Sequence, residues 1–228
     1  MDNEHNASID GDQWAQCVRD NGWLWDAAAG KVSKQTPTLI LAHGSGAPMD
    51  SGFMTNFAAR LAALGINVLR FEFPYMAQRR LDGGKRPPNT TPKLLEHWRE
   101  VYGVVRRHVA GPLAIGGKSM GGRMASMVAD ELGADALVCL GYPFYAVGKP
   151  EKPRVEHLPG LKAPTLIVQG ERDALGDRAA VAGYTLSPSI EVLWLVSGDH
   201  DLKPLKASGF THEQHLATAA GRVAAFLQ

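Results

Sequence analysis

Short apolar runs recur along the chain, and the spacing between them leaves room for a helix. The runs are Thr38–Ala42, Asn67–Phe73, Leu113–Gly117, Ala136–Leu140, Thr165–Gln169 and Glu191–Val196. Each is only a few residues long and contains Val, Leu or Ile, which is typical of strands that are buried on both faces of a parallel sheet. The pattern therefore predicts a sheet whose strands are separated along the chain by helices.

The segments between these runs carry apolar residues at helical spacing. One helix is predicted from a cap at Asp50 or Ser51 to Leu64, where Gly65 ends it. Further helices are predicted from Pro92 onward and over Gly122–Leu132, Asp177–Tyr184 and Thr211–Leu227. Strand and helix thus alternate, which predicts an α/β fold with a mostly parallel, doubly wound sheet and helices on both of its faces.

Two stretches depart from this alternation. In residues 1–34, Trp14, Trp23 and Trp25 are expected to pack in an antiparallel hairpin at the sheet edge, or in an N-terminal extension. The stretch Pro74–Thr91 is rich in Arg, Gly and Pro and is long for a simple connection, so we expect an irregular segment that is functional or mobile. No internal repeat or second domain is evident, and the chain is expected to form a single domain over residues 1–228.

Composition and charge indicate which partners and which cellular compartment to expect for this chain. Hydrophobic residues make up 45% of the chain, and 24 Lys and Arg balance 23 Asp and Glu, so no global field favours nucleic acid or an anionic membrane. Met1–Asp12 lacks the pattern of a signal peptide, and no apolar run reaches the about 20 residues that span a bilayer. The two cysteines, Cys17 and Cys139, suggest no disulfide framework, so a reducing, cytoplasmic location is expected. The oligomeric state stays open.

A candidate nucleophile stands at the end of one apolar run. The sequence Gly117-Lys118-Ser119-Met120-Gly121 is a G-x-S-x-G motif that follows the run Leu113–Gly117 directly and precedes a predicted helix. That strand–turn–helix setting is the nucleophile elbow, in which glycines two residues before and after the serine allow a sharp turn. The alternative is a glycine-rich turn that holds an incidental serine. We favour the elbow because of the residues that follow later in the chain.

An acid and a base follow in the order that this kind of site requires. A serine hydroxyl needs a base to become a good nucleophile, and His200 follows the last apolar run. Asp173 follows the preceding run and is placed to orient the histidine. The order Ser, Asp, His is that of α/β-hydrolases. Each residue alone has a simpler interpretation as a turn or surface residue, but all three come after the carboxyl ends of predicted strands, which meet at one edge of a parallel sheet.

The first apolar run leads into a turn that can complete an acyl-transfer site. It continues as His43-Gly44-Ser45-Gly46, and such a turn can aim a backbone N–H at a developing oxyanion. The backbone N–H groups of Ser45 and Met120 are the candidate oxyanion hole. For His43 we favour a structural role, in which its ring ties the loop down by hydrogen bonds, over direct participation in the reaction.

These motifs together resemble those of the α/β-hydrolase superfamily, and within it the small uncapped hydrolases related to dienelactone hydrolases. More narrowly, residues 116–123 (GGKSMGGR) and 41–46 (LAHGSG) resemble the KANL3/Tex30-like hydrolases. The resemblance extends from about Thr38 to Leu227. It implies an α/β-hydrolase fold without a large cap domain. Dienelactone hydrolases use a cysteine nucleophile, whereas the elbow of this chain carries Ser119, so that particular activity is in doubt.

Candidate substrate contacts are less well defined. Tyr75, Lys118 and Tyr142 are proposed as substrate-binding residues. Basic residues lie in the irregular stretch and beside the elbow, and can bind an anionic substrate group. They are Arg79, Arg80, Lys85, Arg86, Lys118 and Arg123. The alternative, which we favour here, is that they are solvated charges paired with carboxylates such as those of Glu72, Asp82 and Glu96.

The function that best accounts for these features is hydrolysis of a small carboxylic ester or thioester through an acyl-enzyme. The stretch Tyr142–Pro164 is proline-rich and has no convincing amphipathic helix, so no large lid is expected, and an open site suits small esters. No metal or organic cofactor is expected, and the partner is a small-molecule ester. Two alternatives stay open: a non-catalytic interaction module on a hydrolase fold, and an acyltransferase in which an alcohol replaces water.

Overall fold

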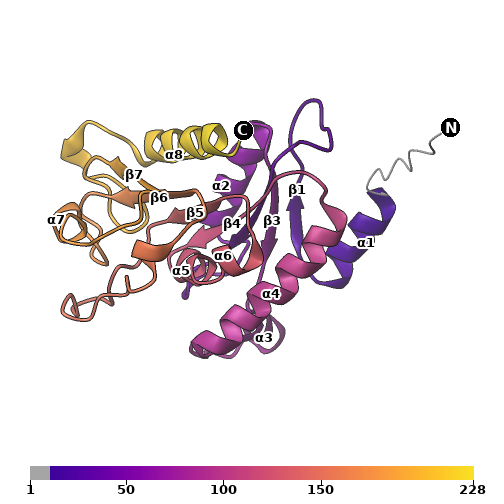
Figure 1. The fold of residues 1–228 in the computed structure, drawn as a ribbon, viewed down its shortest axis with the longest axis horizontal. Helices are drawn as coiled ribbons and strands as arrows, with labels where there is room; N and C mark the ends of the chain where they lie inside the picture. The colour runs from indigo at the N-terminus through magenta and orange to yellow at the C-terminus, as the bar shows by residue number, and fades with distance from the viewer. Residues whose placement is uncertain (1–10) are drawn as a thin grey trace.

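The protein, described by a computed structural model over residues 11–228, is built on a seven-stranded sheet (Figure 1). The strands are β1 (Leu24–Asp26), β2 (Thr38–Ala42), β3 (Asn67–Phe71), β4 (Leu113–Lys118), β5 (Leu137–Leu140), β6 (Thr165–Gly170) and β7 (Ile190–Leu195). Their order is β1-β3-β2-β4-β5-β6-β7, and every pairing is parallel except that of β1 with β3. Most of the polar N-terminal segment that argued against a signal peptide lies outside the described residues.

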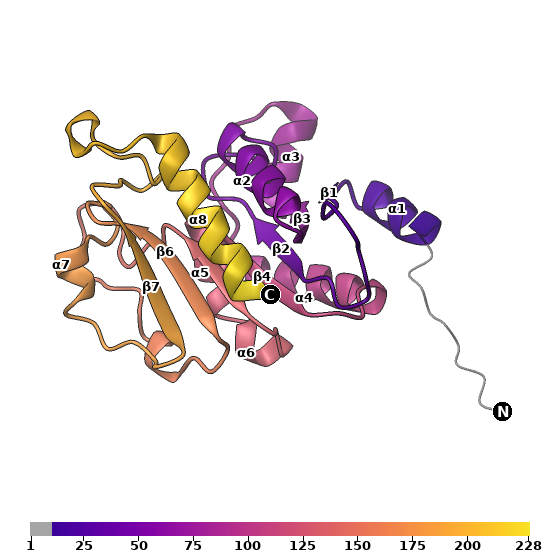
Figure 2. The same ribbon diagram turned by 90° about the horizontal axis from the view of Figure 1, so that it is seen from above.

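Helices cover both faces of this sheet. They are α1 (Gly11–Asp20), α2 (Gly52–Ala63), α3 (Pro74–Asp82), α4 (Thr91–His108), α5 (Met120–Ser126), α6 (Ala129–Leu132), α7 (Arg178–Val181) and α8 (His212–Leu227), with 3₁₀ turns at Leu158–Gly160 and Lys206–Ser208. Helices α2 and α8 contact each other on one face, as Figure 2 shows, and α1, α4 and α5 pack on the other. This is the doubly wound α/β arrangement that the alternating pattern predicts.

The alternation of side chains along each strand separates two hydrophobic cores. In β2, Ile40 and Ala42 belong to the core beneath α1, α4 and α5, whereas Leu39 and Leu41 belong to the core beneath α2 and α8. Successive side chains of a strand point to opposite faces, so a run that is apolar at every position must be covered on both sides. All five residues of β2 are buried accordingly.

The N-terminal segment differs from the predicted hairpin. Trp14 lies in helix α1, where it and Val18, four residues later, form the buried side. Trp25 lies in β1, which pairs with β3. In the predicted hairpin, β1 would have paired with a second strand from the same N-terminal segment. The rings of Trp14 and Trp25 meet edge to face with centroids 5.0 Å apart. The segment does close the sheet edge with an antiparallel strand, but a helix stands where the other half of a hairpin was expected.

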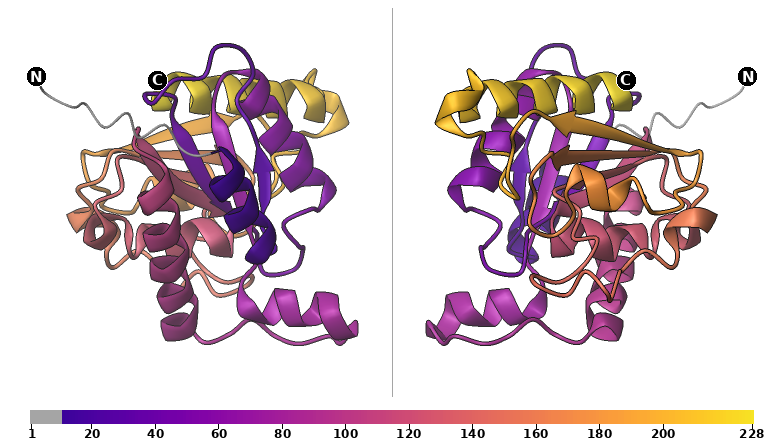
Figure 3. Two further views of the ribbon diagram at one scale, coloured as in Figure 1. Left: turned by 90° about the vertical axis from the view of Figure 1, so that its right-hand side faces the viewer. Right: turned by 90° about the vertical axis from the view of Figure 1, so that its left-hand side faces the viewer.

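The stretch 74–91 is also more regular than predicted. Its first half forms α3, which begins with Pro74 at the first helical turn and ends at Gly83, whose φ of 69° lies in the left-handed region. Residues 83–90 then connect to α4. Figure 3 shows α3 at the lower end of the molecule, near the carboxyl ends of the first strands. Apart from Pro74, the glycines and prolines that suggested irregularity lie in the second half of the stretch.

The segments that follow the strands determine where a site can form. The carboxyl ends of β2, β4, β6 and β7 lead into the segments that hold His43, Ser119, Asp173 and His200. Between β5 and β6 only the short 3₁₀ turn Leu158–Gly160 occurs, so this connection contributes no cap domain. Among residues 11–228, none of the helices combines the length and the apolar character needed to cross a membrane.

Candidate active site

Ser119 stands on a sharp turn between β4 and α5. Its φ of 51° lies in the left-handed region, which is strained for a residue with a side chain. A Cβ on Gly117 would lie 2.6 Å from the carbonyl oxygen of Ala42, and one on Gly121 would lie 2.6 Å from that of His43. Strand, turn and helix thus pack too closely for any larger residue at these two positions. The turn has the geometry that the G-x-S-x-G motif predicts.

The structure brings Ser119, His200 and Asp173 into one chain of hydrogen bonds. Ser119 Oγ lies 2.9 Å from His200 Nε2, and His200 Nδ1 lies 2.8 Å from Asp173 Oδ2. An ionised carboxylate only accepts hydrogen bonds, so the proton of a neutral His200 ring belongs on Nδ1. The other ring nitrogen, Nε2, is then free to accept from the Ser119 hydroxyl. The side chain of Asp173 is fully buried, and that of His200 is 27% exposed.

Two further donors hold the Asp173 carboxylate, and neither was predicted from the sequence. The backbone N–H of Leu175 donates to Oδ1 over 2.8 Å, and Gln169 Nε2 donates to Oδ2 over 2.9 Å. Gln169 is completely buried, and its amide oxygen accepts from the backbone N–H of Tyr142 at 2.7 Å. The available signal was a polar residue at the end of the apolar strand β6, four residues before the acid. Gln169 therefore fixes the carboxylate relative to the neighbouring strand.

Lys118 fastens the loop that holds His200. Its Nζ donates to the carbonyl oxygen of His200 over 2.8 Å and lies 3.2 Å from Asp201 Oδ1. Burial lowers the pKa of Lys118, and the nearby carboxylate of Asp201 opposes that shift. A Cβ on Gly141 would lie 2.8 Å from the same carbonyl oxygen, so the loop also packs directly on the segment after β5. The loop around His200, which we call the base loop, is thus held from two sides.

The loop after β2 lies beside Ser119. His43 Nε2 accepts from the backbone N–H of Phe73 at 3.1 Å, so its Nδ1 carries the proton and donates to the Gly44 carbonyl at 2.6 Å. Burial lowers the pKa of His43, which favours this neutral ring. The Tyr75 hydroxyl donates to the carbonyl oxygen of Ser45 at 2.9 Å. These contacts give His43 the structural role favoured from the sequence.

The candidate oxyanion donors flank the nucleophile. Ser45 and Met120 line a cavity together with Ser119. Met120 is the first residue of α5, where a backbone N–H has no acceptor within its own helix. A Cβ built on Gly44 would lie 3.7 Å from the Ser119 Cβ, which shows how closely the loop approaches the elbow. Both N–H groups thus belong to segments that border the serine.

Two cavities open on Ser119. The larger, of about 590 Å³, lies on the side of Met120 and Arg123 and extends to Arg154. The smaller, of about 210 Å³, is lined by His200 and Lys118. Ser45 and Ser119 border both cavities. A substrate carbonyl at Ser119 would therefore have room for one substituent on each side.

Two of the three residues proposed to bind the substrate do not line the cavities at Ser119. Tyr75 is 2% exposed and Tyr142 is fully buried, and neither is among the described residues that line the two cavities at Ser119. The Tyr142 hydroxyl donates to the carbonyl oxygen of Arg154 at 3.0 Å, so both tyrosines support loops instead of facing the cavities. Lys118 lines the smaller cavity, but its ammonium group is engaged by the base loop. Sequence position alone did not reveal these hydrogen-bond partners.

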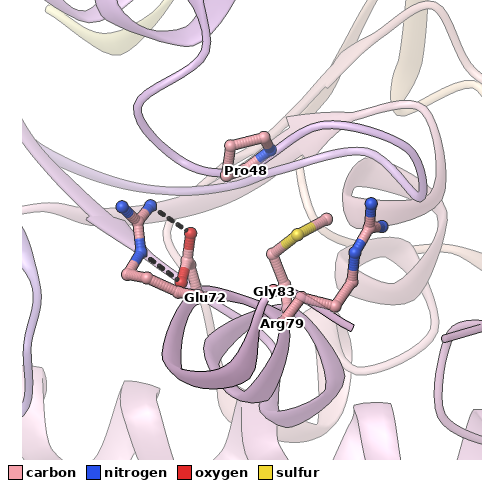
Figure 4. A pocket seen from close by; sticks show the side chains of 6 residues that line it. Pro48, Glu72, Arg79 and Gly83 are labelled. Atoms are coloured by element: carbon pink, nitrogen blue, oxygen red, sulfur yellow. Dashed lines mark hydrogen bonds and ion pairs between the residues drawn. The ribbon is translucent and has the colours of Figure 1, made fainter. Parts of the chain in front are cut away.

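Two of the four basic residues of the stretch 74–91, Arg80 and Arg86, are paired with carboxylates. Arg80 donates to Glu72 Oε1 at 2.6 Å and also bonds Asp50, and Arg86 bonds Asp82. Figure 4 shows the Arg80–Glu72 pair in a separate cavity of about 240 Å³ beside α3, with Arg79 on its opposite wall. No serine or histidine is among the described residues of that wall. Over residues 11–228, no group of three or more His, Cys, Asp or Glu side chains is placed to hold a metal ion.

Comparison with known proteins agrees with this architecture. A serine hydrolase homologue from Coxiella burnetii has a TM-score of 0.69 at 19% identity, over 90% of this chain and 91% of that one. A serine hydrolase without lid from Xanthomonas campestris gives 0.65 at 20%, over 90% and 86%. Dienelactone hydrolase from Anabaena variabilis gives 0.66 at 19%, over 88% and 87%. The sequence model of the family described as "Alpha/beta hydrolase domain" matches residues 35–228, and the chain therefore belongs to the α/β-hydrolases.

Proposed function

We propose that this protein is a serine hydrolase that cleaves a small carboxylic ester or thioester through an acyl-enzyme intermediate. The observation that carries the proposal is the hydrogen-bonded chain from Ser119 through His200 to Asp173, with Ser119 open to two cavities. Nucleophile, base and orienting acid stand in the geometry of a catalytic triad. The resemblance of the fold to a dienelactone hydrolase, whose name denotes cleavage of a lactone, agrees with ester chemistry.

Acylation proceeds as the Ser119 oxygen attacks the substrate carbonyl. His200 Nε2 takes the hydroxyl proton, and the N–H groups of Ser45 and Met120 stabilise the oxyanion of the tetrahedral intermediate. When the intermediate collapses, the bond from carbon to the alcohol oxygen or thiol sulfur breaks, and the imidazolium returns the proton to that leaving atom. Asp173 holds the ring in the required tautomer and stabilises its positive charge.

Deacylation repeats these steps with water as the nucleophile. His200 accepts a proton from the water molecule as its oxygen bonds the acyl carbon, and the ester bond to Ser119 then breaks with transfer of the proton back to Oγ. The products are a carboxylic acid and a free enzyme. Apart from the substrate and water, the groups used in both half-reactions are residues of the chain.

The open site favours short acyl groups. An acyl chain gains about 0.8 kcal/mol per methylene only when that methylene leaves water, and the connection between β5 and β6 supplies no lid to cover it. Chains of about two to six carbons should therefore be preferred. A series of p-nitrophenyl esters tests this, since a kcat/KM that rises steadily to twelve or more carbons would require a covered acyl tunnel. Adding an alcohol acceptor to the same assay separates hydrolysis from acyl transfer by product analysis.

A further inference from the structure

The larger cavity at Ser119 has two arginines in its wall. Arg123 comes from α5, and Arg154 comes from the connection between β5 and β6. Most of the remaining wall is apolar, with a few uncharged polar groups. Its apolar residues include Met124, Pro143 and Leu175, and its uncharged polar residues include Ser45 and Asn89. No carboxylate is among the described residues of this wall, so both charges face a cavity that offers no anion.

Neither arginine is neutralised by the protein. Arg123 Nε is buried and has no hydrogen-bond partner, and neither Arg123 nor Arg154 forms an ion pair within 4.0 Å across residues 11–228. Several other arginines are paired, since Arg80, Arg99 and Arg222 each bond a carboxylate. A buried N–H without a partner loses its hydration without compensation, which is costly unless another group supplies the missing bond.

Electrostatics at Arg123 point in the same direction. Burial lowers the pKa of Arg123, and the positive charge of Arg154 acts the same way. Tyr142 and Glu156 oppose the shift in the pKa of Arg123, but the Glu156 side chain is exposed and bonds neither arginine. An anion that enters the cavity would offset both the lost hydration and the repulsion between the two guanidinium groups.

Hydrogen bonds fix the main chain at both arginines. The N–H of Arg123 donates to the carbonyl oxygen of Ser119 at 3.0 Å, so the nucleophile and this cation lie one helical turn apart. The N–H of Arg154 donates to the carbonyl oxygen of Phe144 at 2.6 Å, and its own carbonyl accepts from the buried Tyr142 hydroxyl. Both side chains therefore start from a fixed main chain, so that only their own rotations have to be ordered when a ligand binds.

The position of the base indicates which part of a substrate meets these arginines. His200 must return its proton to the leaving oxygen or sulfur, so the leaving group has to lie on the His200 side of Ser119. His200 lines the smaller cavity and is not among the residues of the larger one. The acyl part of the substrate consequently occupies the larger cavity, where Arg123 and Arg154 lie.

We infer that the acyl part of the substrate carries a second carboxylate, which Arg123 and Arg154 bind, so that the substrate is a monoester or monothioester of a short dicarboxylic acid. A planar carboxylate matches the forked N–H donors of a guanidinium, and such charge-assisted bonds are among the strongest available to a protein. The inference rests on the proposed function, because it places an acyl group at Ser119.

The test compares two phenyl esters that differ only in charge. One is the monophenyl ester of glutaric acid or adipic acid, and the other has the terminal carboxylate replaced by the isosteric primary amide. After subtraction of the uncatalysed rates, kcat/KM of the wild-type enzyme should be at least about tenfold higher for the carboxylate. In addition, free glutarate should slow the labelling of Ser119 by a fluorophosphonate more effectively than the uncharged diamide, glutaramide, does.

Substitutions assign the preference to the two arginines. Arg123→Met and Arg154→Met should each reduce the carboxylate-to-amide ratio about tenfold or more, and Arg123→Lys should restore part of it by returning the charge without the fork. The matched control is Arg107→Met, which removes an exposed arginine of α4 away from both cavities and should leave the ratio unchanged. The wild-type comparison remains decisive if a variant fails to fold.

The outcomes separate this inference from the proposed function. If the wild-type enzyme hydrolyses both esters with similar kcat/KM, the dicarboxylate assignment is wrong although the hydrolase proposal stands. If a preference exists but both arginine variants retain it, the anion binds elsewhere and the assignment is wrong as well. If no ester is hydrolysed and no fluorophosphonate reacts with Ser119, the proposed function fails and the inference fails with it.

Discussion

Two serines of this molecule contact a histidine at nearly the same distance. Ser119 Oγ lies 2.9 Å from His200 Nε2, and Ser126 Oγ lies 2.8 Å from His157 Nε2. The Ser126 hydroxyl also donates to the carbonyl oxygen of Arg123 at 2.7 Å. A hydroxyl has one proton, and that of Ser126 is already donated to the Arg123 carbonyl, so the His157 ring must donate to Ser126. In the other pair the Ser119 hydroxyl donates to the His200 ring.

The surroundings differ as much as the direction of donation. Ser119 stands at a strained turn and faces two cavities, while Ser126 is 3% exposed within α5. His200 bonds the carboxylate of Asp173, but no carboxylate in the described part of the chain bonds the His157 ring. A close Ser–His contact therefore does not define a nucleophile. The direction of the proton, the third group and access to substrate distinguish the two pairs.

Removing each serine in turn gives the largest expected contrast. Ser119→Ala should lower kcat on p-nitrophenyl acetate by about 10³–10⁶-fold, as expected for loss of a triad serine. Ser126→Ala should keep most of the activity and instead lose about 1–3 kcal/mol of stability, because two buried hydrogen bonds disappear. Steady-state assays and urea unfolding of both variants measure this. The reverse pattern, with an active Ser119→Ala, would mean that the two pairs have been assigned the wrong way round.

The third group provides the next test. Asp173→Asn keeps the shape of the side chain but offers an amide to His200 Nδ1, which favours the wrong tautomer and should lower kcat by about 10⁴-fold. Circular dichroism of the variant serves as the control for folding, since Asp173 is buried. An Asp173→Asn enzyme that is folded and retains kcat close to that of the wild type would show that His200 is oriented by other contacts.

A smaller effect is expected from the tether of the base loop. Lys118→Met removes the bond to the His200 carbonyl while preserving the length of the side chain. A displaced base should lower kcat by about 10–100-fold with little change in KM, because even small misplacement of a catalytic group slows the reaction. Lys118→Arg should recover part of kcat if a donor at this position is what matters. Equal loss in both variants, or a change confined to KM, would argue against a positioning role.

The smallest expected effect concerns pH and the second pair. Burial lowers the pKa of His157 from the ordinary 6.5, and the charge of Arg123 acts in the same direction. The unfolded chain then takes up a proton at this residue before the folded chain does, so His157 should reduce the free energy of unfolding as the pH falls below about 6.5. His43 contributes with the same sign. Urea titrations of wild type and His157→Gln between pH 8 and 5 should give a weaker pH dependence for the variant; identical slopes would contradict this account.

The strands and the order of the site residues could be predicted because both depend on local sequence. The run Thr38–Ala42 and the strand β2 coincide, and the elbow motif places Ser119 between strand and helix in the structure as in the sequence. The hydrogen bonds that fix the site connect residues far apart in the chain, such as Lys118 with His200. No periodicity encodes such contacts, and Tyr75 and Tyr142 were therefore assigned to the substrate although the structure buries them.

The misread stretches have a similar physical origin. Helix α3 comes soon after a strand, and its two buried residues, Tyr75 and Met76, are adjacent in sequence and give no helical period. The sequence pattern therefore resembles a loop. The helix α1 was missed because its two buried residues, Trp14 and Val18, are too few to give a clear period. The Ser126–His157 pair was not anticipated because His157 lies in a connection without regular structure.

The most direct test of the central claim is to map where a fluorophosphonate reacts. The wild-type protein should take up one phosphonyl group per chain, and peptide mass spectrometry should place it on Ser119 and not on Ser126. Ser119→Ala should remain unlabelled, and Asp173→Asn should be labelled far more slowly than wild type. A label found on Ser126, or labelling of Ser119→Ala at the wild-type rate, would contradict the assignment of Ser119, His200 and Asp173 as the reactive group of this hydrolase.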